Sequence, residues 1–105
     1  MLIREQDKGM LTDLINLSID EPVEVWAYGS RVNGIAHDAS DIDLVVRTAS
    51  LRPIRAESLL RLKERITNSN IPVLVEIRDW ALLPYAFHKV IEGRHEVFLS
   101  TLGKT

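Results

Sequence analysis

Two short stretches decide the fold: residues 28–34, with the sequence YGSRVNG, and residues 40–46, with the sequence SDIDLVV. The first follows an apolar run, residues 23–28, whose composition is typical of a strand. The second alternates two aspartates with aliphatic residues. Successive side chains of a strand point to opposite faces, so we expect Asp41 and Asp43 on one face of a second strand.

The spacing of these two aspartates predicts a cation site. Two carboxylates held so close repel each other unless a cation or protons lie between them. Mg²⁺ binds one or two carboxylates and completes its octahedron with water and substrate oxygens, so Mg²⁺ (or Mn²⁺) with a nucleotide is the expected occupant. An Asp-x-Asp pair alone is more often part of an ordinary surface strand. Its place after the glycine turn favours the metal site.

A phosphate-binding turn is predicted before the aspartates. Gly29 permits a tight turn and a close approach of the backbone to a ligand, and Ser30 is a good N-cap for a short helix at residues 31–35. Free amides at a helix start, beside a hydroxyl, suit a phosphate. A Gly-Ser pair after a strand is usually a plain turn, and the order of strand, turn, helix and acidic strand is what favours nucleotide binding.

The residues GSRVNG at 29–34 and SDIDL at 40–44 resemble the GSRxxG…SDxDL signature of the minimal nucleotidyltransferases, the smallest branch of the DNA polymerase β-like superfamily. The resemblance covers nearly the whole chain and implies an α/β polymerase β-like nucleotidyltransferase core. It implies nucleotide binding by Gly29, Ser30 and Arg31. Apart from the resemblance, Arg31 is interpreted as a solvated charge on a short helix.

A third acidic residue is predicted on a later strand at residues 71–78. The alternation puts Glu76 on its less apolar face. If this strand lies beside the aspartate strand, Asp41, Asp43 and Glu76 form a catalytic, metal-binding cluster. The family more often has aspartate at this position, and the extra methylene moves the carboxylate by about 1.5 Å, an error to which catalysis is sensitive. Asp79 is the weaker alternative, because it is expected to leave the strand and cap the next helix.

The remaining pattern predicts three longer helices and an edge strand. Helices are expected over residues 5–19, 54–68 and 81–92, and a short strand over residues 95–99. The last helix is expected to bury one face, made of Leu83, Ala86, Phe87, Val90 and Ile91. The whole chain, residues 1–105, is expected to form one small α/β domain. Its mixed sheet carries helices mainly on one face and leaves the acidic face open to nucleotide.

The composition limits the class of protein. With 105 residues, 46% of them hydrophobic and 27% charged, the chain fits one globular domain with a modest core. A net charge of −2 gives no strong signal for nucleic acid or an anionic membrane. The absence of cysteine excludes a thiolate nucleophile and cysteine-liganded zinc. No apolar stretch approaches the roughly 20 residues that span a bilayer, and no secretory signal is seen, so a cytoplasmic protein is expected.

The resemblance implies transfer of a nucleoside monophosphate, AMP from ATP, to a hydroxyl group. The implied partner is a helical HEPN-type ribonuclease toxin that is silenced by AMPylation of a tyrosine, with this chain as the antitoxin. The acceptor site is expected from that partner or from a second copy, in a homo- or hetero-oligomer. The alternative is a non-catalytic module that binds nucleotide or toxin and neutralises its partner by occlusion. A third, weaker hypothesis is transfer to a small acceptor such as an antibiotic.

Overall fold

One mixed sheet organises the molecule, which the computed structural model describes at residues 1–35, 37 and 40–103. The elements in chain order are α1 (Glu5–Ser18), β1 (Val23–Tyr28), α2 (Ser30–Asn33), β2 (Ile42–Thr48), α3 (Ala56–Thr67), β3 (Val75–Asp79), the 3-10 helix η1 (Trp80–Leu82), α4 (Tyr85–Gly93) and β4 (Glu96–Ser100). The strand order is β3-β2-β1-β4. The β2 and β3 strands are parallel, whereas β1 is antiparallel to both of its neighbours. The predicted α/β fold with a mixed sheet is confirmed.

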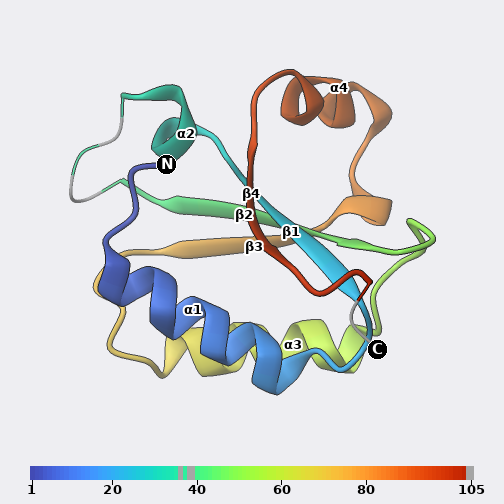
Figure 1. The fold of residues 1–105 in the computed structure, drawn as a ribbon, viewed down its shortest axis with the longest axis horizontal. Helices are drawn as coiled ribbons and strands as arrows, with labels where there is room; N and C mark the ends of the chain where they lie inside the picture. The colour runs from blue at the N-terminus through green and yellow to red at the C-terminus, as the bar shows by residue number, and fades with distance from the viewer. Residues whose placement is uncertain (36, 38–39, 104–105) are drawn as a thin grey trace.

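The two long helices cover one face of this sheet. In Figure 1, α1 and α3 lie below the strands and α4 lies above them. The main core lies between the sheet and the two long helices, where Leu11 of α1 and Leu62 of α3 pack with Val25 and Leu44 of the strands. Because side chains alternate along a strand and Leu44 of β2 faces the main core, Asp43 points to the opposite face of the sheet.

A smaller core lies on that opposite face, under η1 and α4. Its buried members are Trp26, Tyr28, Val45, Trp80 and Ile91. The prediction of helices mainly on one face is therefore confirmed, and the other face is partly covered by the last helix. The predicted acidic residues remain accessible there: Asp41 is exposed, and Asp43 and Glu76 are half-buried.

The C-terminal helix differs from its prediction in length and in its buried face. Residues 81–92 do not form one helix, because Pro84 stands at the N-cap of α4 and separates it from η1. Proline has no N–H to donate and its ring clashes inside a helix, which explains the break. Of the predicted buried face, Ile91 is buried and Leu83 packs against the small core, but Val90 is 70% exposed.

The third strand is shorter than predicted, since β3 begins at Val75 and not at residue 71. Pro72 lacks the N–H that a strand ladder needs. The carbonyl of Leu74 nevertheless accepts a hydrogen bond from the N–H of Ile42, which aligns β3 with the start of β2. The parallel register is thus fixed next to the two aspartates.

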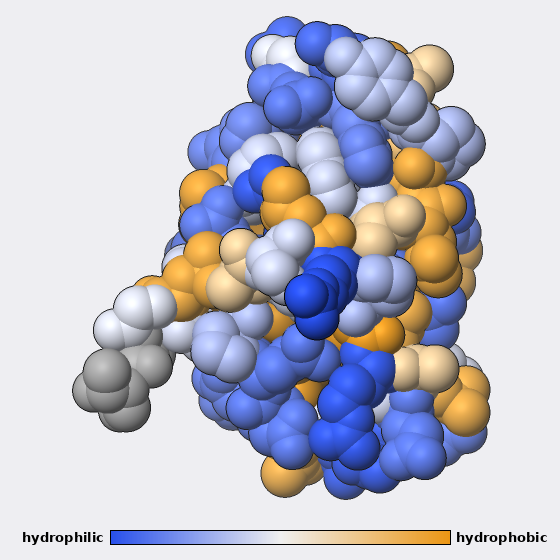
Figure 2. All heavy atoms as spheres, turned by 90° about the vertical axis from the view of Figure 1, so that its right-hand side faces the viewer, coloured by the Kyte–Doolittle hydropathy of each residue, from blue (hydrophilic) through white to orange (hydrophobic). Residues whose placement is uncertain are grey.

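Large hydrophobic side chains are exposed at scattered points of the surface, among them Leu82, Tyr85 and Val90 near the last helix. Figure 2, which shows the side at the right of Figure 1, displays hydrophobic residues interspersed with hydrophilic ones. Within the described ranges, no helix combines the length and hydropathy that crossing a membrane requires.

Replacing Leu44 with alanine is expected to lower the free energy of unfolding by about 2–5 kcal/mol, because a fully buried leucine is lost from the centre of the sheet. Urea unfolding followed by tryptophan fluorescence measures the change. The matched control is Leu60→Ala on α3, which is 59% exposed and should change stability by about 0.5 kcal/mol or less. Similar losses in the two variants would contradict the assignment of the main core.

Candidate active site

A row of three polar side chains, which we call the acidic row, crosses the sheet at one end of β2 and consists of Tyr28, Asp43 and Glu76. Tyr28 of β1 is the register partner of Asp43 in β2, and Asp43 is the register partner of Glu76 in β3. Residues paired in this way point to the same face of a sheet. The structure therefore places Glu76 beside Asp43, on the face opposite to α1 and α3.

The charges in this row are not independent. Burial raises the pKa of Asp43 above its ordinary value, the negative charges of Asp41 and Glu76 raise it further, and the guanidinium of Arg78 lowers it in part. Asp41 is exposed and stands immediately before β2. Two acidic neighbours that disfavour the charged form of a carboxylate create a place where a cation is stabilised.

The turn after β1 packs directly against this carboxylate. Gly29 has a φ of +77°, and a Cβ atom built on it would lie 2.5 Å from Oδ2 of Asp43. Gly29 is also the N-cap of α2, and its carbonyl accepts hydrogen bonds from the N–H groups of Val32 (3.0 Å) and Asn33 (2.9 Å). The prediction that Ser30 caps the helix is wrong, because α2 begins one residue earlier and ends at Asn33. Only a glycine readily provides the positive φ that starts this turn.

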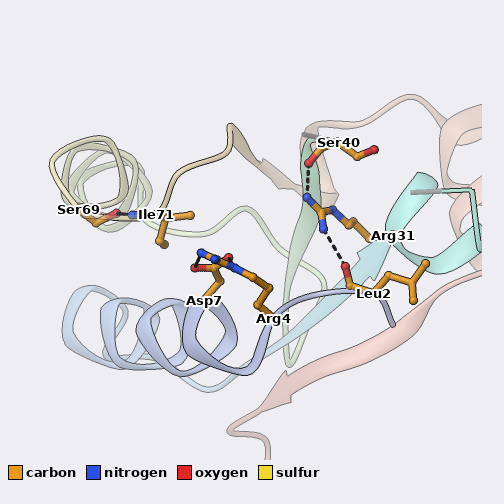
Figure 3. A network of polar contacts seen from close by, with 7 residues as sticks. All are labelled: Leu2, Arg4, Asp7, Arg31, Ser40, Ser69 and Ile71. Atoms are coloured by element: carbon orange, nitrogen blue, oxygen red, sulfur yellow. Dashed lines mark hydrogen bonds and ion pairs between the residues drawn. The ribbon is translucent and has the colours of Figure 1, made fainter. Parts of the chain in front are cut away.

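Arg31 is buried, not solvated, with 7% of its surface exposed. Figure 3 shows its guanidinium between two main-chain carbonyls, those of Leu2 and Ser40, to which it donates hydrogen bonds. The N–H of Leu2 in turn donates to the carbonyl of Arg31 at 2.8 Å. Arg31 thus ties the start of the chain and the residue before Asp41 to α2. Its contact with a phosphate stays a prediction.

Two residues of this region, Tyr28 in the acidic row and Arg78 beside it, were not assigned a role from the sequence. Arg78 donates to Oε2 of Glu76 at 3.0 Å. Burial and the charge of Asp43 raise the pKa of Tyr28, and Arg78 offsets part of this shift. Both could have been found from the strand period of two, since Tyr28 ends β1 and Arg78 follows Glu76 by two positions.

Asp79 belongs to another part of the structure. It is buried, and its carboxylate accepts hydrogen bonds from the N–H groups of Ile54 and Ala81, both at 3.1 Å. It is the N-cap of η1, so the expected capping role is confirmed. Since Asp79 pairs with Val46, whose side chain lies in the main core, it does not join the acidic row.

The donor set of the acidic row fits a hard divalent cation. Carboxylate oxygens are the ligands that Mg²⁺ and Mn²⁺ prefer, and a cation would relieve the repulsion felt by Asp43. Among the residues that the structure describes, no group of three acidic or histidine side chains is already arranged around one metal position. The carboxylate of Glu76 is instead paired with Arg78. Asp41 and Asp43 are therefore the residues that would hold the ion first.

A glycine turn packed on an acidic strand, in a mixed α/β sheet, is the arrangement expected of a nucleotidyltransferase domain. Residues 12–101 match the family model described as polymerase beta, nucleotidyltransferase, and the chain belongs to this family.

Among curated proteins, the chain is 40% identical over 67 residues to the probable protein adenylyltransferase MntA of Haemophilus influenzae (strain ATCC 51907 / DSM 11121 / KW20 / Rd). The aligned stretch covers 64% of this chain and 57% of that relative, so it spans little more than half of the relative's length.

Two solved structures show the same fold. One is a chain of a toxin–antitoxin structure with AMP-PNP, with a TM-score of 0.72 and 17% identity, covering 91% of this chain and 75% of that one. The other is from the tri-AMPylated Shewanella oneidensis HEPN toxin in complex with MNT antitoxin, with a TM-score of 0.69 and 13% identity, covering 94% and 74%. At these identities the likeness establishes the arrangement of the elements.

Replacing Gly29 with alanine is expected to destabilise the protein and to abolish ATP binding, because the new Cβ would displace the carboxylate of Asp43. The matched control is Gly34→Ala. Gly34 has a similar φ of +81°, but a Cβ atom added to it would meet no atom within 4 Å among the described residues other than its chain neighbours. Both variants should lose about 1–2 kcal/mol through backbone strain, and only Gly29→Ala should also lose ATP binding in a calorimetric titration. Equal ATP binding by the two variants would contradict the assignment of the turn.

Replacing Asp43 with asparagine is expected to stabilise the metal-free protein relative to wild type, increasingly as the pH rises. The raised pKa means that the folded state binds the Asp43 proton more tightly than the unfolded chain, whose value is near 3.8. Wild type therefore loses stability as the pH rises from that value through the folded pKa, whereas the asparagine variant has no such loss at this position. Urea unfolding in the presence of a chelator, over a series of pH values, measures the difference. The exposed Asp13→Asn is the control, and a difference that did not change with pH would contradict the electrostatics of the row.

Proposed function

We propose that this chain is a divalent-metal-dependent nucleotidyltransferase that transfers AMP from ATP to a hydroxyl group on a partner protein. The observation that carries the proposal is the packing of the Gly29 turn on Asp43, with Glu76 paired beside it. The partner is a HEPN-type toxin, and this chain is its antitoxin. Support comes from the relative named as a probable protein adenylyltransferase and from the fold shared with a structure of an AMPylated HEPN toxin and an MNT antitoxin.

Different residues of the site bind different parts of the nucleotide. Gly29 and Ser30 receive the β- and γ-phosphates, because the backbone of Gly29 lies directly against the carboxylate of Asp43. Asp41 and Asp43 would hold Mg²⁺ or Mn²⁺, and the cation would supply electrostatic stabilisation of the negative charge that develops in the reaction. Arg31 keeps the turn and the start of β2 in register through its hydrogen bonds to main-chain carbonyls.

The reaction is an in-line displacement at the α-phosphate. The acceptor oxygen forms a bond to the α-phosphorus, the bond to the bridging oxygen breaks, and pyrophosphate leaves. Glu76 orients the acceptor hydroxyl, whose proton passes to solvent water. Positioning and electrostatic stabilisation supply most of the rate in phosphoryl transfer, which suits a domain of this size.

The acceptor is a tyrosine hydroxyl that the partner protein presents. A small domain with one open polar face can bind the nucleotide, while the partner, or a second copy of this chain, completes the acceptor side.

The second candidate function is a non-catalytic module that neutralises the toxin by occlusion. One observation favours it: Glu76 is paired with Arg78, so the third carboxylate of the row is already engaged. The labelling experiment described next distinguishes the enzyme from the binding module.

Incubation of the protein and its toxin partner with Mg²⁺ and ATP labelled at the α-phosphate is expected to label the partner. Asp43→Asn should lower the rate by at least about 100-fold, because a carboxylate that would hold the charge-stabilising cation is lost. The surface variant Asp13→Asn should label the partner at the wild-type rate. If the partner is bound but remains unlabelled with wild type, or is fully neutralised by Asp43→Asn, the binding-module hypothesis replaces the enzyme.

A further inference from the structure

A hollow of about 660 Å³ opens beside the glycine turn, between α2 and α4. Gly29 lines it, and the same residue packs on Asp43. The hollow and the acidic row therefore meet at Gly29. Sites for small ligands commonly measure about 300–1,000 Å³, so the space suits part of a nucleotide.

The walls of this hollow are mainly apolar. The α4 helix contributes Phe87, Val90 and Ile91, and β1 contributes Tyr28. The rings of Tyr28 and Phe87 meet edge to face, with centroids 6.0 Å apart. Val90 is 70% exposed and Phe87 37% exposed, so a ligand can remove their apolar surface from water. A phosphate would lose its hydration against these apolar walls, where Arg94 is the single charged side chain among the described lining residues, whereas a flat heterocycle fits them.

Two polar side chains complete the rim. Asn33 at the end of α2 and Arg94 after α4 line the hollow, and both are exposed. An asparagine amide carries one donor group and one acceptor, the combination that pairs with the edge of adenine. We propose that this hollow holds the purine base of the nucleotide, read by Asn33, while the α-phosphate lies beside Asp43 and the β- and γ-phosphates lie on the turn at Gly29 and Ser30. This inference rests on the proposed nucleotidyltransferase function.

The position of the turn argues against an acceptor side chain in this hollow. In an in-line displacement the attacking oxygen lies opposite the leaving pyrophosphate. The turn at Gly29 and Ser30 receives that pyrophosphate, and the hollow lies on the same side of Asp43 as the turn. The acceptor must therefore approach from the other side, next to Glu76 on β3.

The hollow is preformed, because α4 is tied to η1 and its Ile91 is buried in the small core. His88 stacks on Trp80 at 3.9 Å between ring centroids and shares a hydrogen bond of 2.6 Å with the carbonyl of Trp80. At the other end of the helix, Nδ1 of His95 lies 3.0 Å from the carbonyl oxygen of Ile91. A wall that is already ordered lowers the entropy cost of binding a base.

The test compares the binding of ATP with that of inorganic tripolyphosphate, which has no base, by calorimetric titration with Mg²⁺. Val90→Trp fills the hollow, and Asn33→Ala removes the polar group that reads the base. The matched control is Tyr85→Trp, on the same helix but outside the hollow, where the side chain is also exposed. All three positions are at the surface, so the variants are expected to fold.

Val90→Trp is expected to weaken ATP binding by at least about 10-fold and to leave tripolyphosphate binding unchanged. Asn33→Ala should reduce the preference for ATP over GTP by about 10-fold, and Tyr85→Trp should behave as wild type. Unchanged ATP binding by Val90→Trp, equal weakening of both ligands, or a wild type that does not bind ATP would each overturn the inference.

The transfer assay distinguishes this failure from failure of the proposed function. AMP transfer by wild type, together with normal ATP binding by Val90→Trp, would refute the base site and support the proposed enzyme activity. If Val90→Trp loses ATP binding and wild type transfers no AMP, the base site is supported and the enzyme activity is refuted. The protein then only binds nucleotide.

Discussion

The close contact between Gly29 and the carboxylate of Asp43 is the constraint on which the site depends. Any residue other than glycine would place a Cβ atom 2.5 Å from Oδ2 of Asp43 and would also have to adopt a φ of +77°. The antiparallel pairing of β1 and β2 runs as far as Tyr28 and Asp43, so the turn begins where the pairing ends. The register of two strands thus fixes the separation between the turn and the acidic row.

Arg31 extends this constraint to Ser40, the residue before Asp41. A buried guanidinium needs hydrogen-bond acceptors to offset the loss of water, and here the carbonyls of Leu2 and Ser40 supply them. An arginine in this motif can therefore support nucleotide binding through the backbone that it organises, without touching the nucleotide.

The part of the fold that follows from local pattern was predictable. The expected strand at residues 23–28 coincides with β1, and the alternation around Asp43 correctly assigned the two faces of β2. The placement of Glu76 on the polar face also followed from its strand period. The roles of these residues as metal ligands and of Gly29 and Ser30 in phosphate binding remain predictions.

The buried face of α4 could not be read from its own sequence, because its apolar residues surround most of the helix. Trp26 and Trp80 decide which side is buried, and both lie outside α4. The guanidinium of Arg47 lies over both indole rings, 3.9 Å from the centroid of Trp26 and 4.6 Å from that of Trp80. Such cation–π contacts join residues of β1, β2 and η1, and no local period encodes them. The burial of Arg31 was missed for the same reason, since its partners are distant in sequence.

The two faces of the sheet divide stability and function between them. The main core buries the aliphatic side chains of one face. This burial stabilises the folded state and offsets the repulsion between carboxylates on the other face. There, a half-buried Asp43 lies beside two further carboxylates, and Arg78 offsets only part of the repulsion. A cation that binds the row removes this cost in the folded state, so ligand binding and stability are coupled. A cation that binds the row would therefore owe its affinity to this destabilised carboxylate, whereas a neutral row of the same shape would be more stable but would not bind one.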